Sequence, residues 1–532
     1  MSSDRTRGIA FGAHDAELHR DLRSRFGEGT SVATLQGILK GGPPDHPHSP
    51  FVAAELRSHF RDIALPPAPI PPELFYSELL ERIVPHSAPV TSPRCLAHMT
   101  SAVPEVLLPA AELIVLLNQN MAKQEASRVF TLLERQVIGT LHNLVYAGAD
   151  RFYRECVQDD SHTLGIMTSG GTMSNIAALW IARNLALPPR EAFAGVEREG
   201  LASALRHYGF SRAVVMGSEL LHYSIDKAAA VLGLGSDGCI KLPVDRDRRL
   251  DLGSLRQALE QSRSRNEIVI AVIGVAGTTD CGTIDPLPGI AGLARAFDTR
   301  FHVDAAWGGT LLFSPEHGPK LAGIEQADSV TFDTHKHMHL PVASGVLLLR
   351  DSRAAAVIEK RARYMLQERS GDLGARSLEG SRPCSSLLVH AALHLIGLQG
   401  YRRIVDDSIR RARFMASAIE RHPEFELLAA PATNIVLYRY VPARLRDAAR
   451  RGGLSAEQNA EISALNCAIQ QRQAQGNDAA VSRTVIDYPD GHSKTSIAAL
   501  RAILSHPGTT EDDVMFVLRD QVRLARELDR HT

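Results

Sequence analysis

The sequence predicts an α/β protein with a large, mostly parallel sheet covered by helices and a smaller α/β domain at the C-terminal end. Between residues 164 and 350, short β-rich runs alternate with helical patterns, which is typical of parallel strands joined by crossover helices. From residue 386 onward the pattern is helical, interrupted by the strand-like runs NIVLYRYV and VSRTVID, and a final helix begins near 510.

The N-terminal part has a different texture. Proline-rich runs, GGPPDHPHSP at 41–50 and LPPAPIPPELF at 65–75, disfavour long helices, so we expect a wrapping segment over residues 1–105. Helical periodicity begins near 105 and continues to the glycine at 148. We therefore divide the rest into a large domain, 106–385, and a small C-terminal domain, 386–532.

The expected strands of the large domain are short and apolar, and helical patterns such as LDLGSLRQALEQSRS separate them. In open α/β sheets, ligands bind where the strands end, so the functional residues should follow these runs. The strand-like runs are LGIM at 164–167, AVVMGS at 213–218, EIVIAVIGVA at 267–276, RFHVDAAW at 300–307, SVTFDT at 329–334 and SGVLLLRD at 344–351.

Composition and charge exclude several classes of protein. The chain has 59 basic and 60 acidic residues and no long basic stripe, which argues against a nucleic-acid partner. Its longest apolar runs are too short to span a membrane, and the N-terminus lacks the apolar core of a signal peptide. The six cysteines form no CxxC pair. We expect a soluble, cytoplasmic protein.

TSGGTMSNIAALWIARN, at 168–184, follows an expected strand and opens an apolar-periodic helix. Small residues at a helix start expose backbone N–H groups, and the hydroxyls of Thr172 and Ser174 add donors, so the site suits a phosphate. A plain tight turn is the commoner explanation of such a run, and the spacing matches neither the dinucleotide nor the P-loop motif.

HVDAAWGG, at 302–309, places Asp304 at the end of an expected strand and before small residues. A carboxylate there can orient a cationic ring nitrogen, although a helix N-cap explains a lone aspartate as well. Lys336 follows the run SVTFDTH in the same way. A partly buried lysine at a strand end can act as a nucleophilic amine, whereas a solvated charge is the commoner role of a lone lysine.

The combination carries more weight than any single motif. SELLHYSIDKAA supplies His222, and GTTDCG supplies Thr278. A phosphate anchor, a ring partner, a carboxylate for a ring nitrogen and a lysine for an aldehyde are what pyridoxal phosphate requires.

With these motifs, the chain resembles the group II pyridoxal-phosphate-dependent amino acid decarboxylases, of fold type I, which is the aspartate aminotransferase-like fold. SGGTMSN, HVDAAW and THK stand in the family's order, with 32 residues from Asp304 to Lys336. HMTSAVPEVLLPAAELIV and SLEGSRP look most like the bacterial pyridoxal-dependent aspartate 1-decarboxylase branch.

The resemblance implies a role for each matching residue. Lys336 would bind the cofactor's aldehyde, Asp304 would face the pyridine nitrogen, and His222 would stack on the ring. The implied cofactor-binding residues are Thr172, Met173 through its backbone N–H, Ser174, His222, Thr278, Asp304, Ala306, His335 and Lys336.

The resemblance also implies a substrate site and a reaction. Arg501, in ALRAILSHP, would hold a substrate carboxylate, although a helix-surface arginine is an equal alternative. His98 and Asn118 would line the pocket. We expect decarboxylation of aspartate to β-alanine and CO2. The alternatives are the same reaction on glutamate, 2,4-diaminobutyrate or an aromatic amino acid, a catalytically silent homologue, and a zinc hydrolase.

The residue that returns a proton to the substrate is open. Family members often use a tyrosine on a mobile loop, but residues 367–383 contain none, and the nearest is Tyr364. Tyr364, His222, Lys336 or a residue of another subunit could serve. Gly371 and Gly374 suit a movable cover, and the family forms homodimers with shared active sites.

HKHMH offers a metal alternative. On a strand, His335, His337 and His339 would share one face. We favour the lysine interpretation and expect no metal, because the carboxylate and phosphate features would then have no role and Pro341 makes a continuing strand doubtful.

Overall fold

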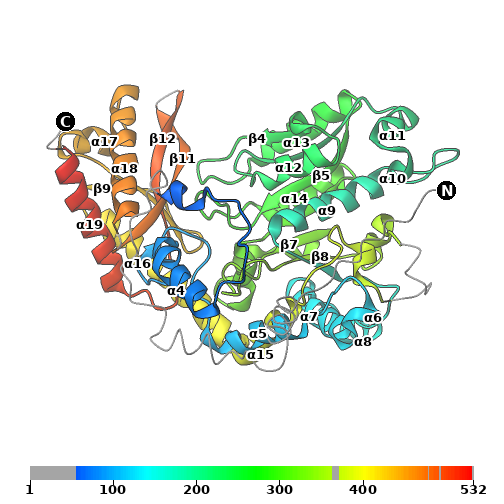
Figure 1. Ribbon diagram of the computed structural model, residues 1–532. Coiled ribbons are helices and arrows are strands. Elements are labelled where there is room, and N and C mark those ends of the chain that lie inside the picture. The colour runs from blue at the N-terminus through cyan, green and yellow to red at the C-terminus, as the bar shows by residue number, and fades with distance from the viewer. Residues whose placement is uncertain (1–55, 362–370, 477, 491–492, 530–532) are drawn as a thin grey trace, which may run out of the picture. The chain divides into compact units, whose positions relative to one another are not determined.

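The computed structural model describes residues 56–361, 371–476, 478–490 and 493–529 (Figure 1). The chain forms two compact units, residues 1–88 and 89–532, and each is described by itself. The expected domain boundary at residue 105 falls within the second unit.

The described part of the first unit contains one α-helix, α4 (Pro72–Arg82), between the 3-10 turns Arg57–Phe60 and Val84–His86. The proline-rich run 65–75 was expected to be extended, yet its last residues begin this helix. Pro72 stands at the first position, where the missing N–H group costs nothing and the fixed φ favours the helix. The run at 41–50 lies outside the described residues.

A seven-stranded sheet forms the centre of the second unit, and its strand order is β2-β8-β7-β6-β5-β3-β4. The pairs from β7 to β4 are parallel, whereas β8 is antiparallel to both of its neighbours. The mostly parallel sheet is therefore confirmed. The strands are β2 (Gly165–Thr168), β3 (Ala213–Ser218), β4 (Cys239–Leu242), β5 (Ile268–Val275), β6 (Arg300–Asp304), β7 (Ser329–Phe332) and β8 (Gly345–Leu349).

Helices cover both faces of this sheet (Figure 1). α9 (Gly171–Ala186) and α12 (Ser224–Val231) pack on the face that carries Val215 and Ile273. α7 (Val129–Tyr146), α13 (Leu252–Ser264) and α14 (Leu287–Ala296) pack on the face that carries Val214 and Val272. Both faces carry an apolar core because successive residues of a central strand point to opposite faces and both sets are apolar, as in β5. The shorter helices are α8 (Asp150–Cys156), α10 (Val196–Glu199) and α11 (Leu201–Tyr208).

The helical pattern from 105 to 148 is divided into three α-helices rather than one. α5 (Leu108–Leu117) ends at Asn118, which has a φ of 44°, and α6 (Gln124–Ser127) ends at Arg128, with a φ of 45°. Left-handed residues stop an α-helix, and asparagine adopts that conformation at little cost. α7 then ends at Ala147, one residue before the expected glycine.

A second, five-stranded sheet has the order β1-β11-β12-β10-β9. Its strands are β1 (Cys95–Leu96), β9 (Phe425–Ala429), β10 (Ile435–Tyr440), β11 (Ala480–Asp490) and β12 (Ser493–Ile503). The helices of this region are α15 (Ser386–Leu395), α16 (Gly397–Arg421), α17 (Arg446–Arg450), α18 (Ala456–Gln475) and α19 (Glu511–Asp529). The expected strands near 435 and 481 and the expected helix near 510 are confirmed.

The cysteines and the helix lengths can be compared with what the sequence predicted. All six cysteines lie in the described ranges, and none forms a disulfide. None of the helices in those ranges combines the length and hydrophobicity that crossing a bilayer requires.

Candidate active site

A cavity of about 280 Å³ opens where β5, β6 and β7 end and α9 begins. The edge formed by the carboxyl ends of parallel strands is where the sequence placed the site. Seven predicted site residues line the cavity: Thr172, Met173, His222, Asp304, Ala306, His335 and Lys336.

Lys336 lies in the turn that follows β7, with its side chain 20% exposed. Its Nζ is 3.1 Å from Oδ2 of Asp333, a carboxylate that is 2% exposed. Lys336 also lines the cavity, and its pairing with a buried carboxylate differs from what a fully solvated lysine would show. A primary amine held in this way can attack an aldehyde once it has lost its proton.

Asp304 ends β6 and is buried, with both carboxylate oxygens hydrogen-bonded. Oδ1 accepts from the backbone N–H of Ala306 at 3.1 Å, and Oδ2 accepts from Nδ2 of Asn175 at 2.9 Å. The hydrogen bond from Ala306 to Oδ1 resembles the one that a helix N-cap aspartate accepts. However, no α-helix begins at Asp304, so the N-cap alternative does not explain the residue. The carboxylate also lines the cavity, where it can face a cationic ring nitrogen.

Asn175 fixes this carboxylate and was not singled out from the sequence. Its Oδ1 accepts hydrogen bonds from Thr331 and His302, so both amide hydrogens are directed to Asp304 and to Ser224. Burial lowers the pKa of His302 to about 4, which keeps that ring neutral. The sequence feature that could have identified Asn175 is its position one helical turn after Gly171. This position lies on the face of α9 that meets the strand ends.

His222 stands in the turn before α12 and joins the same network. Its Nδ1 lies 2.8 Å from Oγ of Ser224, which also accepts from Asn175. Burial lowers the pKa of His222, while the negative charge of Asp304 acts in the opposite direction. The ring is therefore neutral at neutral pH, and a neutral, flat ring suits stacking on an aromatic cofactor.

The glycine turn at the start of α9 forms the other end of the cavity. Gly170 has a φ of 150°, a backbone conformation that residues with a side chain rarely adopt. A Cβ at this position would also lie 3.1 Å from the ring of His335. Met173 and Ser174 donate their backbone N–H groups to the Gly170 carbonyl. The backbone N–H groups of Gly171 and Thr172 lie in the first turn of α9, just before these two residues. In this position they can bind an anion.

Two predicted hydroxyls do not line this cavity. Ser174 is fully buried, and its Oγ lies 2.8 Å from Oγ1 of Thr168. Thr278 is also buried, with its Oγ1 2.9 Å from Oγ1 of Thr283 inside the turn after β5. The neighbouring residues Gly277 and Thr279 line the cavity in its place.

Arg501 lies on β12, so the helix-surface alternative is wrong. Its Nη1 donates to the carbonyl oxygen of Thr279 at 2.6 Å, and its Nε donates to Oγ of Ser482 at 2.8 Å. Thr279 lines the cavity and Arg501 itself does not, so the guanidinium is connected to the cavity through this carbonyl contact. Partial burial and the nearby positive charge of Arg501 lower the pKa of His98.

The remaining predicted residues lie elsewhere. Asn118 is exposed at the end of α5 and does not line the cavity, and Tyr364 is outside the described residues. β7 ends at Phe332, so the three histidines do not share a strand face. His335 contacts the Ser344 carbonyl and His337 contacts Thr310. No cluster of three metal-binding side chains occurs within the described ranges.

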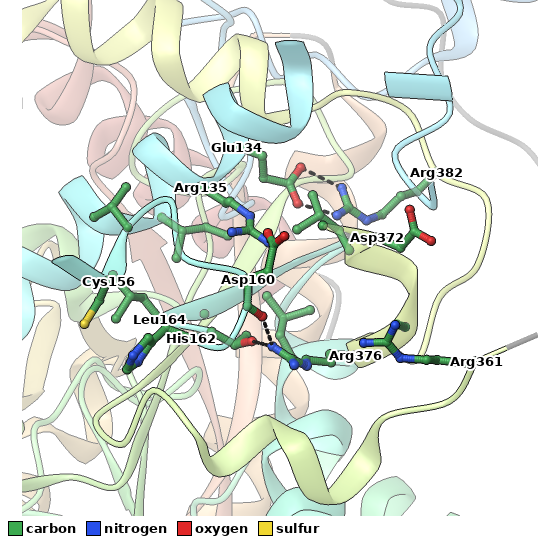
Figure 2. Close-up of a pocket in the computed structure, with 18 residues that line it drawn as sticks. Glu134, Arg135, Cys156, Asp160, His162, Leu164, Arg361, Asp372, Arg376 and Arg382 are labelled. Carbon is green, nitrogen blue, oxygen red and sulfur yellow. Dashed lines mark hydrogen bonds and ion pairs between the residues drawn. The ribbon is translucent and has the colours of Figure 1, made fainter. Parts of the chain in front are cut away.

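A second pocket, of about 50 Å³, is rich in arginine, and we call it the arginine pocket (Figure 2). It lies between α7, the loop before β2 and residues 371–382. Arg382 pairs with Glu134, Arg135 with Asp160 at 2.6 Å, and Arg376 donates to the Asp160 carbonyl and to Thr163. Arg382 thus ties the segment 371–382 to α7, and Arg376 ties it to the loop before β2.

Gly371 and Gly374, the expected hinges of a movable cover, are closely packed. A Cβ on Gly371 would lie 2.5 Å from the side chain of Gln124, and one on Gly374 would lie 2.9 Å from the carbonyl of Ala122. Both backbone N–H groups are bonded to the same stretch of chain. At Gly374 the neighbour is backbone, so glycine allows a close approach there, which is a different reason from hinge motion.

The fold and the cavity define an enzyme that uses pyridoxal phosphate, because the residues present fit that group. The cavity holds an amine for the aldehyde, a buried carboxylate for the ring nitrogen and a glycine turn for the phosphate. The chain belongs to the family described as the pyridoxal-dependent decarboxylase conserved domain, which it matches over residues 63–441.

Relatives across this family are similar to nearly the whole chain. Aspartate 1-decarboxylase of Aliivibrio fischeri is 38% identical over 475 residues, covering 88% of this chain and 86% of the relative. L-2,4-Diaminobutyrate decarboxylase of Rhizobium meliloti is 32% identical over 454 residues, covering 84% and 80%. The crystal structure of mouse CSAD has a TM-score of 0.79 at 24% identity, covering 96% and 99% of the two chains. The protein is a pyridoxal-phosphate-dependent amino acid decarboxylase.

Proposed function

We propose that the protein decarboxylates L-aspartate to β-alanine and CO2. The observation that carries the proposal is the position of Arg501, whose guanidinium contacts the cavity-lining residue Thr279, with His98 in its electrostatic reach. A guanidinium bonded to a cavity-lining residue suits a substrate with a second carboxylate. The similarity to aspartate 1-decarboxylase supports the same substrate.

Each cavity residue would have its own role in binding the cofactor. Lys336 attaches the cofactor, Asp304 holds a proton on the ring nitrogen, and His222 covers one ring face. The Gly171 and Thr172 amides, with His335 nearby, hold the phosphate. Bound pyridoxal phosphate supplies an electron sink for the pair released when the bond to the carboxylate breaks.

Arg501 would orient the substrate so that this bond stands perpendicular to the ring, and a cavity closed to water would favour loss of CO2 over loss of the α-proton. Lys336 and His222, which both line the cavity, would be the groups to move a proton. Tyr364 stays a predicted donor, and a Tyr364→Phe variant that releases CO2 but returns the proton slowly would support it.

2,4-Diaminobutyrate is a second candidate. Asp280 acts on Arg501 as a nearby negative charge, and a carboxylate in this region would suit a substrate with a side-chain ammonium group. The relative from Rhizobium meliloti supports this alternative.

A substrate panel separates the candidates. Purified protein loaded with cofactor would receive aspartate, glutamate, 2,4-diaminobutyrate or an aromatic amino acid, and the amine and CO2 would be quantified. The largest kcat/KM should be for aspartate. Arg501→Gln should lower kcat/KM for aspartate roughly tenfold to a hundredfold, since a hydrogen-bonded charge contact is lost. The matched control is Arg483→Gln, on the neighbouring strand, whose Nη1 bonds to the Cys467 carbonyl instead. No β-alanine from aspartate would exclude this substrate.

We further propose a homodimer with shared active sites. α5 exposes an apolar surface that includes Val115, 76% exposed, and Leu116, 67% exposed, and it packs beside α15, whose Leu395 is 56% exposed. A contiguous apolar surface of this kind favours burial against a second copy. A Val115→Glu, Leu116→Glu variant should sediment as a monomer, and a wild-type monomer would contradict the proposal.

The domain division remains part of the proposal, with residues 1–105 as a wrapping segment, 106–385 carrying the cofactor and 386–532 completing the substrate site. A cytoplasmic location is also retained, and six unpaired cysteines support a reducing compartment. Fractionation of the source cells would test it.

A further inference from the structure

Asp333 follows β7 directly and has no role in the proposed reaction so far. Its carboxylate is 2% exposed, and Oδ2 lies 3.1 Å from Nζ of Lys336 and 3.9 Å from Nε2 of His335. Oδ1 is buried and has no hydrogen-bond donor within the described part of the chain. A buried carboxylate oxygen without a donor is costly, so this group is suited to a ligand or to a proton.

The carboxylate packs against the glycine turn that opens α9. A Cβ on Gly171 would lie 2.9 Å from Oδ2 of Asp333. A Cβ on Gly345 would lie 2.5 Å from Oδ1 and 2.8 Å from the Cα of Gly170. Any anion held by the Gly171 and Thr172 amides therefore lies beside the Asp333 carboxyl group.

This arrangement brings two negative groups together. The cofactor's phosphate is a dianion at pH 8, because its second pKa is about 6, and an ionised Asp333 would repel it across a buried contact. Lys336 offsets the repulsion only while it is an ammonium ion, and it must lose a proton to attack the aldehyde. His335 binds the Ser344 carbonyl through Nδ1, so its Nε2 carries no hydrogen when the ring is neutral.

We propose that Asp333 keeps this proton in the site and shares it with the cofactor's phosphate. As Lys336 becomes nucleophilic, an N–H bond of Nζ breaks and an O–H bond forms on Oδ2, with no change in the number of electrons. The neutral carboxyl group then donates a hydrogen bond to a phosphate oxygen. Neutralisation also makes Oδ1 a carbonyl oxygen, which is less costly to bury without a donor than a charged one.

Other titratable groups face Asp333 from several elements. Lys336 and His335 come from its own turn, and His222, before α12, is within its electrostatic reach. Asp304 acts on the same histidine from β6. Comparing two cofactor forms that differ only in the phosphate cancels the contributions these groups share.

The test counts protons during binding. Pyridoxal phosphate and pyridoxal would be titrated into cofactor-free protein at pH 8 by calorimetry, in two buffers of different ionisation enthalpy. The wild type should retain about one proton more with pyridoxal phosphate than with pyridoxal, because only the phosphate shares it. Asp333→Asn should abolish the difference. Asp304→Asn, the matched loss of a buried carboxylate on the ring side, should preserve it.

A second readout is the ratio of the dissociation constants of pyridoxal phosphate and pyridoxal. In the wild type this ratio should rise about tenfold per pH unit over the range in which the pyridoxal phosphate complex keeps the extra proton, and in Asp333→Asn it should be constant above pH 7. Equal proton counts for the two ligands in the wild type would overturn the proposal, whether or not the variant folds. A ratio lowered by one constant factor at every pH in Asp333→Asn would also overturn it, since that is the behaviour of an aspartate that stays ionised.

The inference rests on the proposed attachment of the cofactor to Lys336, and the two can fail separately. Borohydride reduction of both complexes, followed by peptide mass spectrometry, reports where the aldehyde is attached. Attachment at Lys336 with equal proton counts would refute the role of Asp333 alone. Attachment elsewhere would refute the proposed site as well.

Discussion

The cavity and the arginine pocket both concentrate charged side chains, but they use them differently. In the arginine pocket, Arg382 faces Glu134 and Arg135 faces Asp160, so opposite charges of the chain neutralise one another (Figure 2). In the cavity, Lys336 and Asp333 face open volume, and one oxygen of Asp333 has no donor among the described residues. Nε of Arg382 also has no hydrogen-bond partner among the described residues, so the distinguishing feature of the cavity is an unpartnered anionic oxygen beside a volume of about 280 Å³, against about 50 Å³ in the arginine pocket.

The largest effect should follow from Lys336→Ala, because it removes the amine that attaches the cofactor. Activity should fall by roughly 10³-fold or more, as when a covalent nucleophile is lost. Absorbance from the cofactor joined to lysine should disappear, measured on protein incubated with excess pyridoxal phosphate. If the Lys336→Ala variant kept this absorbance, the cavity would not be the site of cofactor attachment, and it could no longer be distinguished from the arginine pocket by function.

Glu134→Ala tests the arginine pocket and should act on stability. Glu134 and Arg382 have side chains 1% and 7% exposed, so the change leaves a buried guanidinium unpaired. Breaking such a pair costs about 3–5 kcal/mol, measured as the free energy of unfolding in denaturant.

The control for this change removes both charges. Glu134→Leu with Arg382→Met should recover most of the lost stability, because a buried pair is often replaced by apolar side chains at little cost. Folded Glu134→Ala at low temperature should keep its cofactor affinity. A loss of cofactor binding with unchanged stability would mean that the pocket is functional.

Asp304→Asn tests the cavity from the opposite direction and should act on chemistry. The side chains are nearly isosteric, so stability should change little, while the ring nitrogen loses its negative partner. We expect kcat to fall by roughly 10²-fold, the scale of losing one preorganised electrostatic contact. Steady-state kinetics at saturating cofactor measures this, and an unchanged kcat would exclude the assigned role of Asp304.

Acidification should weaken the fold through buried neutral histidines, with the smallest effect per residue. Burial lowers the pKa of His142, on α7, to about 4 from 6.5. The unfolded chain therefore binds a proton first, and the stability from this residue is complete above pH 6.5 and is lost as the pH falls toward 4. The loss from pH 7 to pH 5 is roughly 2 kcal/mol.

His142→Gln should flatten the pH dependence of the unfolding free energy by about this amount. Asp285 works in the opposite direction, because burial raises its pKa to about 6, and its contribution is lost as the pH rises. A variant as acid-sensitive as the wild type would show that the denatured state is not protonated first at this position.

The sequence was most informative for residues that the order of the parallel strands brings to one edge of the sheet. Lys336 and Asp304 could be predicted to meet because both follow parallel strands, whose carboxyl ends lie at one edge of a sheet. Gly170 and Gly171 could be predicted because a helix start exposes backbone donors. Both arguments need only local patterns and the order of the strands.

The rest depended on partners that are distant in the sequence. Asp333 adjoins a motif that was singled out, yet its importance lies in its burial and in the close approach of Gly345. Ser174 and Thr278 carry suitable hydroxyls, but neighbouring threonines already engage them. The breaks at Asn118 and Arg128 are single left-handed residues within a stretch that the sequence analysis assigned to one helical pattern, and periodicity does not detect such residues.

The most direct test of the central claim is the site of cofactor attachment. Protein saturated with pyridoxal phosphate would be reduced with borohydride, digested and analysed by mass spectrometry. The expected result is one reduced pyridoxal phosphate group on the peptide that contains Lys336, and none in Lys336→Ala. An unmodified Lys336 in saturated, catalytically active protein would contradict the assignment of this cavity as the active site.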